Sequence, residues 1–162
     1  MAKRALSLFF ILLCLGMVGC DHATKHAART LLPRSGAVSV VPGVFDLRYA
    51  ENRDMAFSLL RRTTFEGKSV VLASIAVLGL LFICALWWQR RRAPAVEQIG
   101  FALVVSGAIG NVLDRVVLGY VVDFFHIHRW PIFNVADAAI VAGVALFAVA
   151  ALRSRPGPAA TA

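Results

Sequence analysis

Residues 69–88 form an unbroken apolar stretch without a single charged side chain, and no other feature constrains the fold as strongly. A helix of about 20 apolar residues is long enough to cross about 30 Å of bilayer hydrocarbon. Three further stretches of similar length and mostly apolar composition occupy 5–24, 96–113 and 133–152. The sequence therefore predicts an all-α membrane protein whose single domain, residues 1–162, is a bundle of four transmembrane helices.

The basic charge of the chain agrees with a membrane location. Hydrophobic residues make up 59% of the sequence, and 14 arginines and three lysines give a net charge of +8. In a soluble protein such a charge would suggest binding to nucleic acid. Here the arginines flank the apolar stretches, as they do in the cytoplasmic loops of membrane proteins. We therefore expect contact with membrane lipid and no binding of nucleic acid.

The position of the arginines also predicts the orientation of the bundle. Arg90, Arg91 and Arg92 fill the short connection between the second and third stretches, and short basic loops stay in the cytoplasm. The segments on that side hold seven Lys or Arg in 21 residues, whereas the segments on the other side hold ten in 63. Both termini are therefore predicted to be cytoplasmic.

The long segment 25–68 lies between the first two stretches and is predicted to contain β structure. GAVSVV at 36–41, a Pro-Gly pair and VFDLRY at 44–49 predict two short strands around a turn, because apolar and polar residues alternate along the second one. We expect a small β element on the membrane surface in this outer loop. The polar tail 154–162 contains proline and is predicted to be disordered.

Four aspartates fall at one level of the expected bundle. Asp21 and Asp114 lie at the outer ends of the first and third stretches, Asp123 lies in the outer connection, and Asp137 lies one turn inside the fourth stretch. Charged groups within membrane segments are costly and are usually functional. Glu97 lies at the opposite face, where an ordinary solvated charge explains it.

Two neighbouring carboxyl groups in a site with little water can catalyse hydrolysis as an acid and a base. They cannot easily both ionise, so one keeps its proton at neutral pH. The ionised group can take a proton from an attacking water while the protonated group stabilises the oxyanion, which is the chemistry of an aspartyl peptidase. Asp123 and Asp137 have no basic neighbour in the sequence, so they are the better pair.

Basic neighbours offer a structural explanation for the other two aspartates. Asp21 lies one helical turn before Lys25, so an ion pair is the simpler interpretation of this residue. Asp114 precedes Arg115, and its chemistry alone leaves both a structural and a functional role open.

Other catalytic chemistries fit the sequence less well. His126 and His128 lie close to Asp123 and could bind a metal, but two histidines separated by one residue are a weak signal. A serine and lysine pair would need Lys25 or Lys68, and neither has a convincing serine partner.

Two other classes of protein are alternatives to a peptidase. Residues 17–20, MVGC, follow a basic start and an apolar run, as in the signal peptide of a lipoprotein, but a lipoprotein needs no further membrane segments. We therefore interpret Cys20 as a packing residue. A proton-coupled transporter would also carry intramembrane aspartates, but its charges would be spread through the depth of the membrane.

Four motifs resemble those of lipoprotein signal peptidase, also called signal peptidase II, a bacterial intramembrane aspartyl peptidase with four helices. They are DHATK at 21–25, GAIGNVLDR at 107–115, VVDFF at 121–125 and FNVAD at 133–137. The resemblance covers nearly the whole chain, and the order and spacing of the motifs are highly specific.

The resemblance implies a function and a set of site residues. Asp123 and Asp137 match the catalytic pair, which agrees with the choice made from their chemistry. The implied substrates are prolipoproteins with a diacylglyceryl group on the cysteine that follows the cut, and no cofactor or metal is implied. The implied location is the bacterial inner membrane, with the active site at its outer face. Supporting or substrate-binding positions match Asn52, Asn111, Asp114, Arg115 and Asn134, and positions near the rim match Asp21 and Lys25.

One motif departs from the family pattern. Asn52, Ala56 and Phe57 match it, but Asp54 replaces a glycine that would serve a turn or a close backbone approach. We interpret the chain as a divergent paralogue with an altered substrate range or altered binding of inhibitors such as globomycin. Both aspartates of the expected pair are retained, so we expect activity to be retained as well.

Overall fold

The computed structural model describes residues 2–53 and 68–153, so Asp54 and the tail 154–162 lie outside the described residues. All four helices in these two ranges are long and apolar enough to cross a membrane, which confirms the predicted bundle of four transmembrane helices. In chain order the elements are α1 (Ala2–Leu31), β1 (Val38–Val41), β2 (Phe45–Asn52), α2 (Lys68–Arg90), α3 (Ala95–Leu118), β3 (Val121–Ile127) and α4 (Val135–Arg153).

Two helices extend further than the apolar stretches that predicted them. α1 ends seven residues after position 24, and α3 ends five residues after position 113. At a rise of 1.5 Å per residue, the 30 residues of α1 span about 45 Å, more than the hydrocarbon thickness of a bilayer. Apolar length therefore located the membrane crossing, but it missed the last turns of α1 and α3. Those turns carry Lys25 and Asp114.

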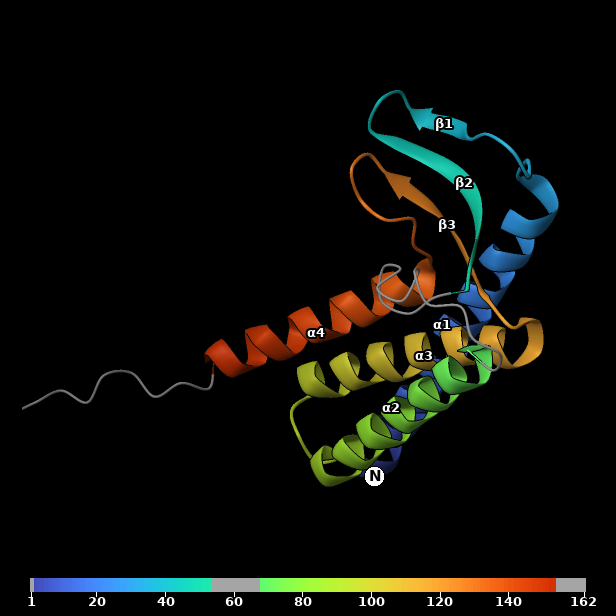
Figure 1. Cartoon of the computed structure of the whole chain (residues 1–162). Coiled ribbons are helices and arrows are strands. Elements are labelled where there is room, and N and C mark those ends of the chain that lie inside the picture. The colour runs from blue at the N-terminus through green and yellow to red at the C-terminus, as the bar shows by residue number, and fades with distance from the viewer. Residues whose placement is uncertain (1, 54–67, 154–162) are drawn as a thin grey trace, which may run out of the picture.

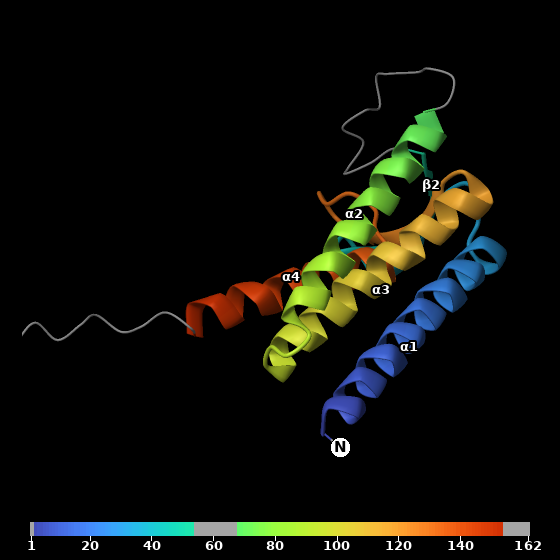
Figure 2. The same cartoon turned by 90° about the horizontal axis from the view of Figure 1, so that it is seen from below.

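α3 is the central helix of the bundle. It contacts each of the other three helices, and Figure 2 shows it running between α1 and α2. Its closest partner is α4, and glycines make this approach possible. A Cβ atom on Gly143 would lie 2.6 Å from the carbonyl oxygen of Gly100, and a Cβ atom on Gly107 would collide with the carbonyl oxygen of Ala136. The small residues of α3 and α4 therefore serve close packing of the two helices.

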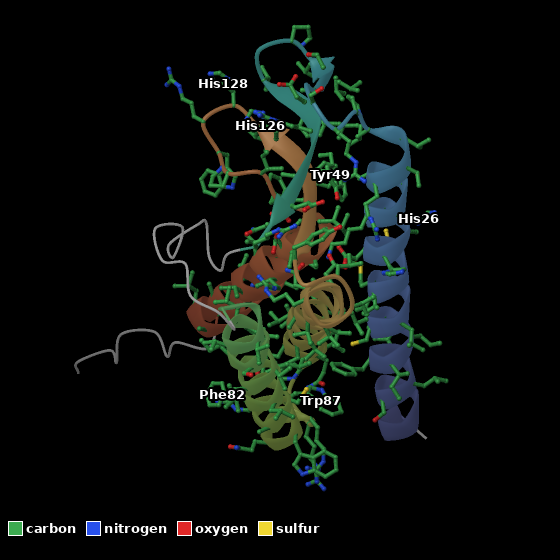
Figure 3. The ribbon with its side chains drawn as sticks, turned by 45° about the vertical axis from the view of Figure 1, so that its right-hand side comes forward. His26, Tyr49, Phe82, Trp87, His126 and His128 are labelled. Carbon is green, nitrogen blue, oxygen red and sulfur yellow. The ribbon has the colours of Figure 1, made fainter. Side chains whose placement is uncertain are left out.

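Aromatic packing joins the helices at the end away from the sheet. The ring of Phe10 in α1 stacks on Trp87 in α2, with 4.4 Å between centroids. Figure 3 shows Phe82 pointing away from the other helices, and its side chain is exposed. Cys14 packs in the same cluster as Phe10, but Cys20 is exposed on α1. The expectation that Cys20 is a packing residue was therefore wrong.

A three-stranded antiparallel sheet projects beyond one end of the bundle, with the strand order β1-β2-β3 (Figure 1). β1 and β2 confirm the two strands expected in the first loop. β3 was not predicted, because residues 121–124 are buried on both faces and show no alternation of apolar and polar residues. The sheet is therefore not confined to the first loop, since its third strand comes from the connection between α3 and α4.

The turn into β3 depends on one glycine. Gly119 caps the C-terminus of α3 with a φ of 78°, in the left-handed region that favours glycine. β3 begins two residues later, at Val121. This tight reversal places β3 directly after the helix that carries Asn111 and Asp114.

Candidate active site

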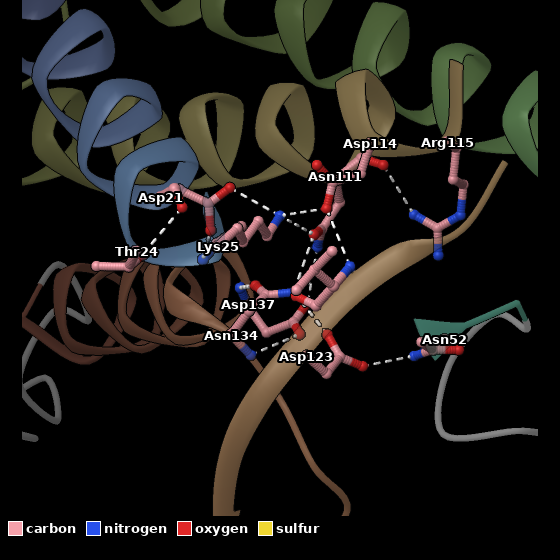
Figure 4. A network of polar contacts seen from close by, with 12 residues as sticks. Asp21, Thr24, Lys25, Asn52, Asn111, Asp114, Arg115, Asp123, Asn134 and Asp137 are labelled. Atoms are coloured by element: carbon pink, nitrogen blue, oxygen red, sulfur yellow. Dashed lines mark hydrogen bonds and ion pairs between the residues drawn. The ribbon is translucent and has the colours of Figure 1, made fainter. Parts of the chain in front are cut away.

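Buried polar side chains gather where α1, α3, β3 and the start of α4 meet, at the sheet end of the bundle (Figure 4). No buried side-chain nitrogen or oxygen in the described residues lacks a hydrogen-bond partner. Burial of polar groups is tolerated when each of them is bonded in this way. The buried members of the cluster are Asp21, Lys25, Asn111, Asp114, Asp123 and Asn134, and Asp137 is partly buried beside them.

Asp123 lies on β3 with only 2% of its surface exposed. Its Oδ2 accepts a hydrogen bond of 2.9 Å from Nδ2 of Asn52, and its Oδ1 accepts one of 2.7 Å from Nδ2 of Asn134. The sheet register explains the first contact. Asn52 pairs with Val121, so Asp123 is its diagonal neighbour on the same face.

Asp137 lies in the first turn of α4, where a capping box holds it. Asn134, just before the helix, accepts a hydrogen bond of 2.9 Å at Oδ1 from the backbone N–H of Asp137. In return, Oδ2 of Asp137 accepts a bond of 3.3 Å from the backbone N–H of Asn134. An Asn followed three residues later by an acidic residue is a recognisable helix-start signal, and it could have been identified in the sequence.

Asn134 and Asn111 connect the two carboxyl groups. Asn134 is bonded to Asp123 through its amide and to Asp137 through the capping box, and it is fully buried. Asn111 donates from Nδ2 to Oδ1 of Asp137 at 2.7 Å. The two asparagines also bond to each other, from Nδ2 of Asn134 to Oδ1 of Asn111, at 3.2 Å. The aspartates of β3 and α4 are therefore held by one continuous network.

The surroundings of Asp123 favour its protonated form. Burial is the largest influence and the nearby charge of Asp137 is the second, and together they raise the pKa of Asp123 to about 7. Hydrogen bonds from Asn52 and Asn134, and the charge of Lys25, act in the opposite direction. A carboxyl group with a pKa near neutrality can hold a proton and release it during a reaction.

A second group of carboxylates surrounds Lys25. Its ammonium nitrogen lies 2.7 Å from Oδ2 of Asp21 and 3.0 Å from Oδ2 of Asp114, and it donates to Oδ1 of Asn111 at 3.1 Å. The ion pair expected between Asp21 and Lys25 is present. Asp21 and Lys25 are each 2% exposed, so both lie inside the protein. They are buried because α1 continues as a helix through this region and packs against α3.

Asp21 and Asp114 also bind backbone groups of neighbouring elements. Oδ1 of Asp21 accepts the N–H of Ala136 at 2.9 Å, which caps the first turn of α4. Oδ2 of Asp114 accepts the N–H of Val122 at 3.1 Å, which ties β3 to α3. Asp114 therefore makes two contacts between elements, one to Lys25 in α1 and one to β3.

Gly110 allows the cluster around Lys25 to form, and no sequence signal for this role was recognised. A Cβ atom at this position would lie 2.5 Å from Oδ2 of Asp21. The absence of a side chain on α3 therefore makes room for the carboxylate from α1.

Arg115 lies at the edge of the site. Its Nη1 donates to the carbonyl oxygen of Asn111 at 3.2 Å, and the charges of Asp137 and Asp123 both act on it. It also lines a groove of about 630 Å³ between α2 and α3. The other lining residues are mostly apolar: Val70, Ala73, Ser74, Val77, Leu78, Val116 and Gly119.

The histidines weighed as metal ligands are arranged differently. Nδ1 of His126 lies 3.7 Å from Oδ2 of Asp46, across the β2–β3 pair, and His128 is exposed. In residues 2–53 and 68–153, no group of three or more His, Cys, Asp or Glu side chains is close enough to hold a metal.

Comparisons with known proteins agree on one family. Residues 13–153 match the family described as Signal peptidase (SPase) II. The chain is 38% identical over 157 residues to the lipoprotein signal peptidase of Syntrophotalea carbinolica, covering 91% of this chain and 94% of that protein. It is 36% identical over 139 residues to the lipoprotein signal peptidase of Solibacter usitatus, covering 83% and 85%.

A solved structure supports the same conclusion. A bacterial membrane enzyme determined by the in meso method at 2.3 Å resolution aligns with a TM-score of 0.78 and 26% identity, over 95% of this chain and 93% of that one. The match therefore extends to both the helices and the sheet. It confirms the resemblance identified from the four motifs. The chain is a membrane peptidase that belongs to the signal peptidase II family.

Proposed function

We propose that Asp123 and Asp137 are the catalytic pair with which this peptidase removes signal peptides from prolipoproteins. The observation that carries the proposal is the link through Asn134, which holds two carboxyl groups from separate elements in one network. The raised pKa of Asp123 provides the unequal protonation that aspartyl chemistry requires.

The roles of the two aspartates follow from their burial. Asp123 is the more deeply buried and carries the proton, and Asp137 is partly exposed and is the base. Asp137 takes a proton from water as the oxygen of that water bonds to the peptide carbonyl carbon. Asp123 gives its proton to the carbonyl oxygen, so a neutral diol forms. When the C–N bond breaks, Asp137 gives its proton to the departing nitrogen, and Asp123 recovers one from a diol hydroxyl.

The groove between α2 and α3 is the proposed site for the lipid part of the substrate. We infer that the substrates carry a diacylglyceryl group on the cysteine after the cut, as the family resemblance implies. The apolar lining of the groove suits acyl chains, and its size of about 630 Å³ is ample for a chain segment. Arg115 belongs to both the groove lining and the surroundings of the aspartates, so lipid held there would place its cysteine close to the pair.

The proposed orientation puts the active site at the outer face of the bacterial inner membrane, with both termini in the cytoplasm. The sheet and the site lie at one end of the bundle, while the start of α1 and the α2–α3 loop lie at the other (Figure 1). Arg90, Arg91 and Arg92 belong to that second end, and loops rich in arginine are retained in the cytoplasm. We expect globomycin to inhibit the enzyme by competing for the site.

The test is cleavage of a diacylglyceryl-modified prolipoprotein by the purified protein in detergent, followed on a gel. Asp123→Asn and Asp137→Asn are each expected to lower the rate by roughly a thousandfold or more, because each removes one proton-transfer step. Thermal unfolding in the same detergent checks that both variants are folded. The same prolipoprotein without its diacylglyceryl group tests the lipid requirement. Substantial cleavage by either folded variant would contradict the assignment of the pair.

A further inference from the structure

We propose that Lys25 is a positioning residue that fixes the direction of the Asn111 amide and so aims its N–H group at Asp137. This inference rests on the proposal that Asp137 is the catalytic base. The contact from the ammonium to Asn111 carries the inference, because the bonding partners of Lys25 are Asn111, Asp21 and Asp114 and not the two proposed catalytic carboxyl groups.

The bonding capacity of an ammonium group determines which end of Asn111 it can meet. Lysine has three N–H donors and no acceptor, so each of its partners must present an oxygen. Two donors of Lys25 go to Asp21 and Asp114, and the third goes to Oδ1 of Asn111 at 3.1 Å. The amide NH₂ of Asn111 must therefore point the other way, and it lies 2.7 Å from Oδ1 of Asp137.

The same constraint passes to the second asparagine. Oδ1 of Asn111 also accepts from Nδ2 of Asn134 at 3.2 Å. The Nδ2 group of Asn134 is thereby directed to the side where Oδ1 of Asp123 accepts it at 2.7 Å. If the side-chain amide of Asn111 were flipped by 180°, its NH₂ would face both an ammonium and an amide donor, and its oxygen would face a carboxylate. Lys25 thus fixes the direction of the Asn111 amide, and Asn111 together with the backbone N–H of Asp137 fixes that of Asn134.

Stability alone is a weak explanation for a lysine at this place. Buried ion pairs are often replaced by apolar residues with no loss of stability, because the cost of desolvating the charges offsets their attraction. The charged groups that face this region come from four elements: Asp21 from α1, Asp114 and Arg115 from α3, Asp123 from β3 and Asp137 from α4. Lys25 is the residue that connects the ion pairs with Asp21 and Asp114 to Asn111.

Two neutral variants of similar length distinguish the effect of the N–H donor of Lys25 from the effect of its positive charge. Lys25→Met removes both the positive charge and the N–H donor, whereas Lys25→Gln removes the charge but keeps an amide donor for Oδ1 of Asn111. The charge of Lys25 lowers the pKa of Asp123, so its loss moves the alkaline limb of the rate profile to higher pH in both variants. Only the methionine variant loses the directed hydrogen bond.

The measurement is the pH dependence of kcat and kcat/KM for cleavage of a diacylglyceryl-modified prolipoprotein. In Lys25→Met we expect kcat to fall about tenfold with little change in KM, and the acid limb to move up by about one pH unit, which corresponds to ~1.4 kcal/mol. In Lys25→Gln we expect the acid limb to stay close to that of the parent. Equal acid limbs and equal kcat values in the two variants would overturn the proposal.

A second pair of variants covers the case in which Lys25→Met does not fold. Asp21→Asn and Asp114→Asn together leave no unpaired buried charge when Lys25 is removed, and each Asn side chain keeps an oxygen for its backbone partner. Lys25→Met and Lys25→Gln are then compared in this background, with the same difference in the acid limb expected. Asp123→Asn and Asp137→Asn accompany every assay. If these two variants still cleave, the assignment of the catalytic pair is wrong. If they are inactive while Lys25→Met and Lys25→Gln give identical pH profiles, only the role proposed for Lys25 is rejected.

Discussion

Two pairs of aspartates lie side by side in this protein, and they differ in whether a cation lies between them. Asp21 and Asp114 both touch the ammonium of Lys25, within 3.0 Å. Asp123 and Asp137 are held by asparagine amides instead. Burial raises the pKa of Asp123 to about 7, and the charge of Asp137 adds to this effect, because amides satisfy the carboxyl oxygens without adding a full positive charge.

This contrast explains why the sequence neighbours of an aspartate help to predict its contacts. The pair with Lys25 is bound to backbone groups of α4 and β3, and so it fixes the elements that carry the other pair. The pair held by amides is the proposed catalytic pair. Asp21, Asp114 and Asp123 are all buried, so the partner, and not burial alone, distinguishes the carboxylates around Lys25 from the proposed catalytic pair.

Gly110→Ala should break the first pair, and it has the largest expected effect on stability. The added Cβ would lie 2.5 Å from Oδ2 of Asp21, so either the carboxylate must leave Lys25 or α1 must move away from α3. Overpacking of this kind costs about 1–3 kcal/mol, which should appear as a clear fall in Tm in detergent. Gly79→Ala on α2 is the matched control, because nothing lies within 4 Å of its added Cβ. Equal Tm values for the two variants would contradict the tight fit at Gly110.

Asn52→Ala should change the second pair without breaking it. The amide of Asn52 donates to Oδ2 of Asp123 and lowers its pKa, so removing the amide raises that pKa further. The protonated form then persists to higher pH, and the alkaline limb of kcat/KM should move up by about half to one pH unit. Arg53→Gln, at the next position, is the control and should leave that limb in place. A limb that moves down in Asn52→Ala would reverse the role assigned to this amide.

The sequence predicted the helices and the four aspartates well because both depend on local signals. Membrane length and charge placement identify a spanning helix, and costly charges such as Asp21 and Asp137 are easy to find within apolar stretches. β3 escaped prediction because burial on both faces removes the alternation by which a strand is usually identified. The lengths of α1 and α3 were missed because charged residues, Lys25 in α1 and Asp114 with Arg115 in α3, interrupt the apolar stretches before the helices end.

The hydrogen-bond and ion-pair network of the site could not be predicted, since it depends on contacts between residues far apart in the chain. Lys25 bonds to Asn111, 86 positions away, and Asp21 bonds to the backbone of Ala136, 115 positions away. The i,i+4 spacing correctly suggested that Asp21 pairs with Lys25, but it gave no sign of Asp114 as the second partner. Only the packing of α1 against α3 and α4 brings these groups together.

Glu51 is a third kind of carboxylate, which lies beside cations but is little buried. Its substitution has the smallest expected effect on stability. Its side chain lies 3.0 Å from Nη2 of Arg53 and 3.5 Å from Nη1 of Arg34, and the hydrogen bond from Arg53 is the main reason that its pKa is lowered. A lowered pKa adds stability above the unfolded value, and that stability is lost as the pH falls through the folded value. Figure 3 shows the neighbouring Tyr49 between the sheet and α1.

Glu51→Gln should therefore cost little, because exposed ion pairs contribute only about 0–1 kcal/mol and salt screens them. The expected Tm change near pH 7 is small and should shrink further at high salt, and once the pH has fallen below the lowered pKa of Glu51 the variant and the parent should unfold alike. Arg34→Gln is the matched control, since it removes a partner of the same carboxylate. A loss as large as that of Gly110→Ala would mean that positive charge near a carboxylate governs stability here regardless of burial, and the contrast between the two buried pairs would then need another cause.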